Sequence, residues 1–319
     1  MASAYTAEQI SAYLNHIQLP KRYHLDNEPP HPRDLAFLNA LHVHTISTIP
    51  YENLTLHYSS ARQISLHPQR LFQKIVRDGR GRGGYCMEIS IMFNHILRGL
   101  GFEAYTAGVR IRQRENGIPR GDYIGWVHIV NIVTLPGREK YVVDVGFGGD
   151  GATKPMPLIE EHIISNIGEQ EICFVRDHIP QQVNRAEHTK LWIYQYRNGK
   201  DTDWNPFYAF AEFEFLEPDF GIMNWYTGSS PLSHQTYNVL IVKFLRRKKE
   251  GEEREEVYGK RMLVNGVIKE NLGGRTNVVK ECSTEEERLA ALKEYFGISL
   301  TEEERLSILG HCSELRGTS

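Results

Sequence analysis

The sequence predicts an α+β protein in which helices come first, strands follow and the C-terminal part is mixed. Apolar residues recur at helical spacing over the first hundred residues, the period then changes to that of strands, and helical patterns return near the end. Helices and strands in separate runs argue against a doubly wound parallel sheet. With 319 residues, 40% of them hydrophobic, the chain can form two or three packed units.

Four helices are expected in the first hundred residues. The first begins after Thr6, whose spacing to Gln9 matches a capping box, and it ends before Pro20. The last carries one apolar stripe and is closed by Gly101. The expected extents are Thr6 to Pro20, 35–47, 68–76, and Tyr85 to Gly101.

The strands are expected where β-branched and aromatic residues cluster between turn residues. The stretch 207–216 is ambiguous between helix and strand. Two further helices are expected over 283–295 and 301–309, the second beginning at a capping box of Thr301 and Glu304. The expected strands are 103–112, 126–135, 141–147, 172–175, 191–197, 239–245 and 261–264.

Charge and composition weigh against several classes of function. A net charge of −3 and a pI near 6.5 give no reason to expect a nucleic-acid partner. The basic cluster 243–249 runs into the acidic run 250–256, which indicates a solvated hairpin tip. We find neither a secretory signal nor an apolar run near the roughly 20 residues that span a bilayer. A cytoplasmic protein without a membrane partner is expected.

Cysteine and histidine spacing does not indicate a metal site or a disulfide framework. The four cysteines are widely spaced and include no CxxC pair. His42 and His44 form the closest histidine pair, but they lie in a stretch that looks helical and has no carboxylate at ligand spacing. We therefore expect reduced thiols and no bound metal.

A glycine-rich stretch, 79–84, leads directly into the helix that starts near Cys86. A cysteine in the first turn of a helix lies beside free N–H groups and the positive end of the helix dipole, which favours the thiolate. Arg80 and Arg82 act in the same direction, and the same N–H groups can stabilise an oxyanion. An arbitrary cysteine is more often a small buried hydrophobe, so a nucleophilic role requires a base.

His128 and Asp144 each interrupt an apolar, strand-like run. A charged residue in such a run needs a partner or a function. Pro136-Gly137 lies between the runs and signals a hairpin. If the hairpin loop has an odd number of residues, His128 and Asp144 are direct or diagonal neighbours on one face, whereas a four-residue loop separates them. With Cys86 they would form a triad, in which Asp144 orients His128 and His128 moves the proton.

Four segments, in order, resemble motifs of the arylamine N-acetyltransferase family. Arg82-Gly83-Gly84-Tyr85-Cys86-Met87-Glu88 resembles R-G-G-x-C-x-E, and Pro50-Tyr51-Glu52-Asn53-Leu54 resembles P-F-E-N-L. His128 falls in the family's histidine strand, and 143–148 resembles V-D-x-G-F-G. All four motifs occur in the family's order, and the layout of the chain resembles that of the family over most of its length.

The resemblance implies a three-part fold with the triad arranged as in cysteine proteases. A helical domain (1–102) would carry Cys86, an antiparallel β-barrel domain (103–210) would carry His128 and Asp144, and an interdomain segment with an α/β lid would follow (211–319). It also implies ping-pong transfer, in which acetyl-CoA acylates Cys86 and an arylamine or arylhydrazine takes the acyl group, as in xenobiotic metabolism. CoA would be a co-substrate, with no bound cofactor.

The resemblance further implies roles for individual residues. Arg82 and Glu52 would form a supporting ion pair, Tyr51, Val127 and Phe147 would line the substrate pocket, and Gly125 and Ser233 would contact CoA.

Two positions depart from the family pattern: Ser90 stands where Asn is common, and Tyr51 replaces the usual Phe. We expect the Tyr51 hydroxyl to favour acceptors with polar ring substituents. The acyl donor is open between acetyl, malonyl and propionyl.

The same three residues are compatible with other functions. A Cys-His-Asp triad also serves a papain-like hydrolase or a transglutaminase-like amide enzyme, and a binding module with a decayed site is a further alternative. The polar stretch 159–189 is a candidate insertion over the barrel.

Overall fold

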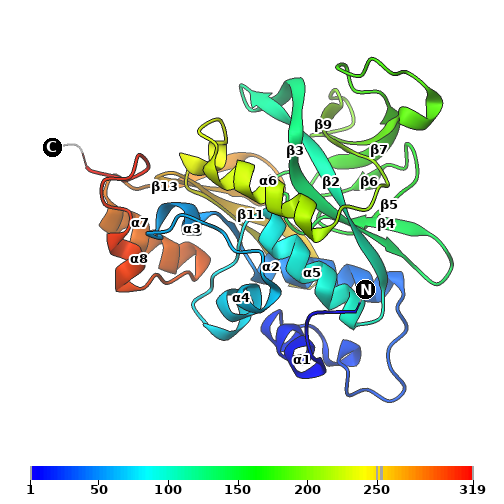
Figure 1. Ribbon diagram of the computed structural model, residues 1–319, viewed down its shortest axis with the longest axis horizontal. Coiled ribbons are helices and arrows are strands. Elements are labelled where there is room, and N and C mark those ends of the chain that lie inside the picture. Colours follow the sequence, from blue (N-terminus) through cyan, green and yellow to red (C-terminus); the bar gives the residue numbers. More distant parts are fainter. Residues whose placement is uncertain (1, 249–250, 252–253, 318–319) are drawn as a thin grey trace.

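The computed structural model describes residues 2–248, 251 and 254–317 and shows three parts (Figure 1). Helices of the first hundred residues lie at the bottom of the view, a strand barrel at the upper right, and a second sheet with the C-terminal helices at the left. The predicted α+β class and its three-part arrangement are confirmed. The domain boundaries stay a prediction.

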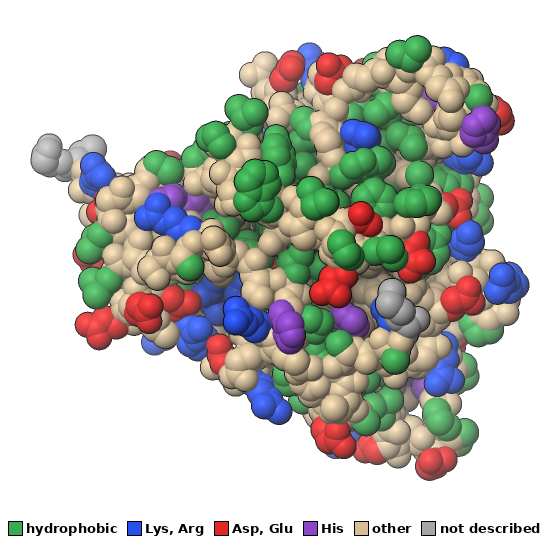
Figure 2. Space-filling model, in the orientation of Figure 1, with side chains coloured by type: hydrophobic (Ala, Val, Ile, Leu, Met, Phe, Trp, Pro, Cys, Tyr) green, Lys and Arg blue, Asp and Glu red, His purple; other side chains and the backbone are tan. Residues whose placement is uncertain are grey.

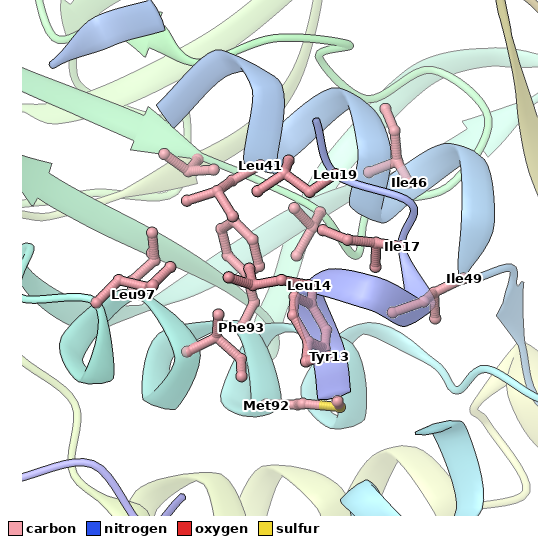
Figure 3. Close-up of a cluster of buried hydrophobic side chains, with 14 of the residues drawn as sticks. Tyr13, Leu14, Ile17, Leu19, Leu41, Ile46, Ile49, Met92, Phe93 and Leu97 are labelled. Carbon is pink, nitrogen blue, oxygen red and sulfur yellow. The ribbon is translucent and has the colours of Figure 1, made fainter. Parts of the chain in front are cut away.

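The N-terminal helices pack around one apolar core. Helix α1 (Ala7–His16) begins at the predicted capping box, in which the Thr6 side chain accepts from the N–H of Gln9. Leu14 of α1, Leu41 of α2 and Phe93 of α5 meet in this core and are fully buried (Figure 3). Burying a side chain of this size contributes about 1.5–3 kcal/mol. The helices after α1 are α2 (Leu35–Thr48), α3 (Leu54–His57), α4 (Pro68–Phe72), which continues as a π-helical turn (Gln73–Arg77), and α5 (Cys86–Gly99).

Among the described residues, eight antiparallel strands form the barrel in the order β5-β4-β3-β2-β9-β8-β7-β6. The chain after β5 joins the two ends of this sheet, because Met156 pairs with Val142 and Glu160 bridges to Phe174. The barrel is therefore nearly closed. Its strands are β2 (Glu103–Glu115), β3 (Ile118–Thr134), β4 (Lys140–Val143), β5 (Met156–Pro157), β6 (Ile164–Ser165), β7 (Glu171–Asp177), β8 (Leu191–Arg197) and β9 (Asn205–Phe210).

Three expectations for this region need correction. The strand expected over 141–147 ends at Val143, because Asp144 turns its carboxylate to the N–H of Gly146. The ambiguous stretch 207–216 is strand only as far as Phe210. The stretch 159–189 is not an insertion over the barrel, because β6 and β7 lie within it and form part of the barrel wall.

A five-stranded antiparallel sheet forms the third part of the described chain, in the order β1-β10-β11-β12-β13. Its first strand comes from the helical region, since Tyr51 of β1 pairs with Val242 of β10. The predicted hairpin at 243–256 is formed by β10 and β11, while Lys249, Glu250, Glu252 and Glu253 lie outside the described residues. The strands are β1 (Tyr51–Glu52), β10 (Leu240–Lys248), β11 (Glu255–Val264), β12 (Val267–Asn271) and β13 (Thr276–Glu281).

Helix α6 (Glu217–Ser229) was not expected from the sequence, because Gly221 and Gly228 weaken its helical pattern. It packs Phe220 and Met223 toward Cys86. Helices α7 (Glu285–Ala291) and α8 (Glu302–Leu306) follow, the latter at the predicted capping box of Thr301. In the part of the chain that the structure describes, none of the helices has the length and apolar character to cross a membrane.

Two buried asparagines hold α5 against β3. Asn94 donates to the side-chain oxygen of Asn131 at 2.9 Å, and Asn131 donates to the carbonyl of Ser90 at 3.1 Å. These bonds fix the height of α5, and therefore of Cys86, relative to the strand that carries His128.

We predict that Asn131→Ala lowers the free energy of unfolding by about 1–3 kcal/mol, because it leaves buried polar groups of α5 without partners. Urea denaturation would measure this change. The exposed Asn277→Ala in β13 is the control and should change stability by less than about 0.5 kcal/mol. Equal effects of the two substitutions would contradict this role for Asn131.

Candidate active site

Cys86 is the first residue of α5 and is 5% exposed. The residue before it, Tyr85, is the N-cap, and its N–H is bound by the carboxylate of Glu88 at 3.1 Å. Early N–H groups of a helix have no acceptor within the helix, so they face the space beside Cys86. The nucleophile candidate therefore lies at the positive end of the helix dipole, as predicted.

Two glycines allow other backbone segments to approach the Cys86 turn closely. A Cβ on Gly83 would lie 1.8 Å from the carbonyl oxygen of Pro50, and one on Gly146 would lie 2.8 Å from the Cα of Cys86. Neither distance is sterically possible. Glycine at these positions thus lets the segment before β1 and the turn after Asp144 pack against the nucleophile turn.

His128 and Asp144 meet as diagonal neighbours of the β3–β4 hairpin. Asn131 pairs with Val143 and Thr134 with Lys140, so the loop 135–139 has an odd number of residues, namely five. His128 Nε2 lies 2.9 Å from Asp144 Oδ2, and Asp144 Oδ1 accepts the N–H of Gly146 at 3.1 Å. Both side chains are buried. Nδ1 is the other ring nitrogen of His128, and the Cys86 thiol is close enough to raise the pKa of the ring.

The surroundings of His128 favour its protonated form. Burial alone lowers the pKa of His128, but the Asp144 carboxylate and hydrogen bonds to Asp144 and Cys86 outweigh burial and raise it to about 10. The ring also lies edge-on to Phe147, with centroids 5.1 Å apart, and near Tyr208. An imidazolium beside Cys86 favours the thiolate.

A buried ion-pair network supports the nucleophile loop. Arg82 Nε donates to Glu52 Oε1 at 2.9 Å, and the N–H of Gly83 donates to the same oxygen at 3.2 Å. Burial raises the pKa of Glu52, but the charges of Arg82 and Lys74 outweigh it and lower the pKa to about 2. The predicted pairing of Arg82 with Glu52 is thus present in the structure.

The C-terminal part also holds this loop. Glu304 of α8 accepts from Arg82 Nη1 at 2.5 Å with one oxygen and from Arg80 Nη1 with the other. The N–H of Ser299 donates to the carbonyl of Arg80 at 2.9 Å. Nothing in the sequence around Glu304 pointed to a site role, since it appears only as part of a helix cap.

The predicted pocket residues Tyr51, Val127 and Phe147 all lie beside the triad. The carbonyl of Val127 is 3.8 Å from the sulfur of Cys86. Phe147 also contacts Phe207, with centroids 4.7 Å apart. Tyr51 belongs to the apolar cluster around Cys86.

The two predicted CoA contacts, Gly125 and Ser233, differ in exposure. Gly125 is exposed on β3. Ser233 is buried, and its hydroxyl donates to the carbonyl of Thr227 at 2.6 Å, so the hydroxyl caps local structure. Hydrophobic side chains gather over α6 and the neighbouring strands on the face shown in Figure 2. Ile222 and Trp225 of α6 are exposed.

The sequence did not single out Tyr208, whose ring lies near His128, or Gln235, which donates a hydrogen bond to the Tyr51 hydroxyl. Tyr208 lies in a strand that read as ambiguous, and Gln235 lies in a short turn without a motif. Within the described ranges, the structure contains no group of three or more His, Cys, Asp or Glu side chains suited to a metal ion.

A family model described as N-acetyltransferase matches residues 34–305. The chain is 36% identical to the N-malonyltransferase FDB2 of Fusarium pseudograminearum, over 94% of this chain and 91% of that protein. It is 30% identical to an arylamine N-acetyltransferase of Mycolicibacterium smegmatis, over 72% and 74% of the two chains.

The chain belongs to the arylamine N-acetyltransferase family. It is therefore an acyltransferase. The arylamine N-acetyltransferase of Mycobacterium marinum in complex with CoA has the same fold, with a TM-score of 0.73 at 20% identity over 95% of this chain and 99% of that one.

We predict that iodoacetamide modifies Cys86 faster than the exposed Cys312 at pH 7, because the His128 ring, whose pKa is raised to about 10, is protonated and lies beside the Cys86 thiol. Peptide mapping would follow both Cys86 and the exposed Cys312, which serves as the control. His128→Asn should abolish the difference in rate, and equal modification rates of the two cysteines in the wild-type protein would contradict an activated nucleophile.

We predict that Glu304→Ala lowers kcat about tenfold with little change in KM, because misplacing the nucleophile loop misaligns Cys86. Glu304→Gln should restore part of the rate, since an amide oxygen still accepts one hydrogen bond. The neighbouring exposed Glu303→Ala is the control. Steady-state kinetics would measure kcat and KM separately. An equal loss of kcat in Glu304→Ala and in the control Glu303→Ala would contradict a positioning role for Glu304.

Proposed function

We propose that this enzyme transfers an acetyl group from acetyl-CoA to the nitrogen of an arylamine or arylhydrazine through an acyl-Cys86 intermediate. The observation that carries the proposal is the buried arrangement of Cys86, His128 and Asp144, with His128 Nε2 2.9 Å from Asp144. The catalytic roles of these three residues are part of the proposal.

In the first half-reaction, the Cys86 thiolate attacks the thioester carbonyl carbon and forms a new S–C bond. The S–C bond to CoA breaks, and the leaving CoA thiolate takes the proton held by His128. N–H groups at the start of α5 stabilise the oxyanion formed on the way. Asp144 keeps the imidazole oriented and stabilises its charged form.

In the second half-reaction, the amine nitrogen attacks the acyl carbon of acyl-Cys86. His128 accepts the proton that the amine loses, a C–N bond forms, and Cys86 leaves as the thiolate. The aromatic rings of Phe147 and Phe207 beside the triad support an aromatic acceptor.

The surroundings of Cys86 favour an uncharged acyl group. Among the described side chains that pack around Cys86, those of the apolar cluster are Leu56, Ile64, Tyr85, Met87, Ile129, Phe220 and Met223. The nearby cations Arg82 and Lys74 are already paired with Glu52, Glu88 and Glu304. A malonyl carboxylate placed among these apolar side chains would be buried without Arg82 or Lys74 to pair with, which is costly. We therefore propose acetyl as the donor group although the Fusarium relative is named an N-malonyltransferase.

The CoA contacts of Gly125 and Ser233 remain part of this proposal. The Mycobacterium marinum structure contains CoA, which supports an acyl-CoA donor for this chain.

We predict that acetyl-CoA alone adds one acetyl group to the protein, that Cys86→Ala prevents this, and that aniline discharges it. Intact mass spectrometry would measure each step. Malonyl-CoA should acylate Cys86 at least about tenfold more slowly, since an unpaired buried carboxylate costs more than about 1.4 kcal/mol.

The outcomes separate the alternatives. Faster acylation by malonyl-CoA would keep the mechanism and overturn the donor. No adduct from any acyl-CoA would contradict the transferase and favour a Cys-His-Asp hydrolase or transglutaminase-like amide enzyme.

A further inference from the structure

The orientation of the Asn53 side-chain amide is set by backbone groups. Its Oδ1 accepts the N–H of Leu240 at 2.8 Å, and its Nδ2 donates to the carbonyls of Asn238 at 2.8 Å and Gln235 at 3.1 Å. A backbone N–H can only donate and a carbonyl can only accept. The amide of Asn53 therefore has one possible orientation.

This orientation also determines that of Gln235. Asn53 Nδ2, whose two N–H groups are shared among these acceptors, lies 3.0 Å from Gln235 Oε1, so the Nε2 of Gln235 lies at the opposite end of its amide. That nitrogen is 2.6 Å from the hydroxyl oxygen of Tyr51 and 3.0 Å from Nε2 of His234. An amide nitrogen can only donate, so the Tyr51 oxygen accepts from Gln235. The proton of the Tyr51 hydroxyl must then point away from Gln235.

Tyr51 stands beside the reacting thiol. Its backbone bridges to Gly84, two residues before Cys86, and its side chain packs in the apolar cluster that contains Cys86. A Cβ on Gly148, in the loop that carries Phe147, would lie 3.9 Å from Cγ of Tyr51. The ring therefore lies beside the nucleophile turn and the loop that carries Phe147.

The hydroxyl keeps its proton in this environment. Burial and the nearby Cys86 raise the pKa of Tyr51 well above its ordinary value, with further contributions from Glu88 and Glu52. A neutral O–H group whose oxygen is already bound by Gln235 is available as a donor to a substrate.

We propose that Tyr51, held by Gln235 as a hydrogen-bond donor, selects arylamines whose ring carries a hydrogen-bond acceptor, such as an alkoxy group. This inference rests on the proposed function and specifies its acceptor class. The site selects for a substituent that accepts a hydrogen bond and not for every polar substituent. The reason is that the Tyr51 hydroxyl can donate, whereas its oxygen already accepts a hydrogen bond from Gln235.

The test compares kcat/KM for methoxyanilines with that for ethylanilines of nearly equal size, for the ortho, meta and para isomers. Tyr51→Phe removes the donor. Gln235→Glu keeps the hydroxyl but replaces the donating amide by an accepting carboxylate, so the Tyr51 proton turns toward residue 235.

For at least one isomer, both variants should lower the methoxy-to-ethyl ratio about 3- to 10-fold, the loss expected for one hydrogen bond. Comparing this ratio between the wild-type protein and each variant cancels the electronic difference between the two anilines. Tyr258→Phe in β11 is the matched control and should leave the ratio unchanged.

Acylation of Cys86 by acetyl-CoA is measured in the same variants. If acylation occurs and no isomer changes its ratio in Tyr51→Phe, the inference fails while the proposed function stands. An equal rate loss for all acceptors and for acylation itself would place the hydroxyl on the acyl oxygen and overturn the inference. If the wild-type protein forms no acyl-enzyme, the proposed function fails first.

Discussion

The buried carboxylate of Glu52 is the group on which the arrangement of the site depends. It accepts hydrogen bonds from the guanidinium of Arg82 and from the N–H groups of Gly83 and Leu54, and it is fully buried. Through these bonds it joins strand β1 to the loop that ends at Cys86. Such a pair adds little net stability over an apolar one, but breaking it costs about 3–5 kcal/mol because a buried charge is left without a partner. Its physical role is thus to hold one loop conformation.

Three segments far apart in the chain pack around Cys86 and the loop that leads to it. Strand β1 extends the C-terminal sheet by pairing with β10, and Glu304 of α8 contacts Arg82 from the other side. The barrel contributes His128 and Asp144 through a single hairpin, and Gly146 brings the end of that hairpin against Cys86. Cys86 and His128 therefore come from different structural parts, and polar contacts at their junction set the relation between them.

The same junction bears on what we propose the enzyme accepts. Near Cys86, Arg82 and Lys74 are engaged by carboxylates, and the donor group that we propose is accordingly uncharged. The hydroxyl of Tyr51 is the polar exception, and its hydrogen-bond direction follows from Asn53 and Gln235. Close relationship in sequence to an N-malonyltransferase thus does not by itself determine the donor, because selectivity depends on a few charges around one sulfur atom.

Local patterns in the sequence determined the secondary structure near the site and singled out Cys86, His128 and Asp144 as candidate reactive residues. The capping box of Thr6, the glycine stretch before Cys86, and the hairpin signal at Pro136-Gly137 each act over a few residues, so their consequences could be predicted. The diagonal contact of His128 with Asp144 required one further fact, the odd length of the loop, which only the structure supplied.

Tertiary structure alone decided which distant residues complete the site. The ion pair of Glu304 with Arg82 joins residues 222 positions apart, and the Gln235–Tyr51 hydrogen bond joins residues 184 positions apart. No local pattern marks these contacts or helix α6. The physical reason is that side-chain periodicity and capping report on neighbours along the chain. Hydrogen-bond direction and ion pairing between segments depend on how the three parts pack, which the one-dimensional pattern does not contain.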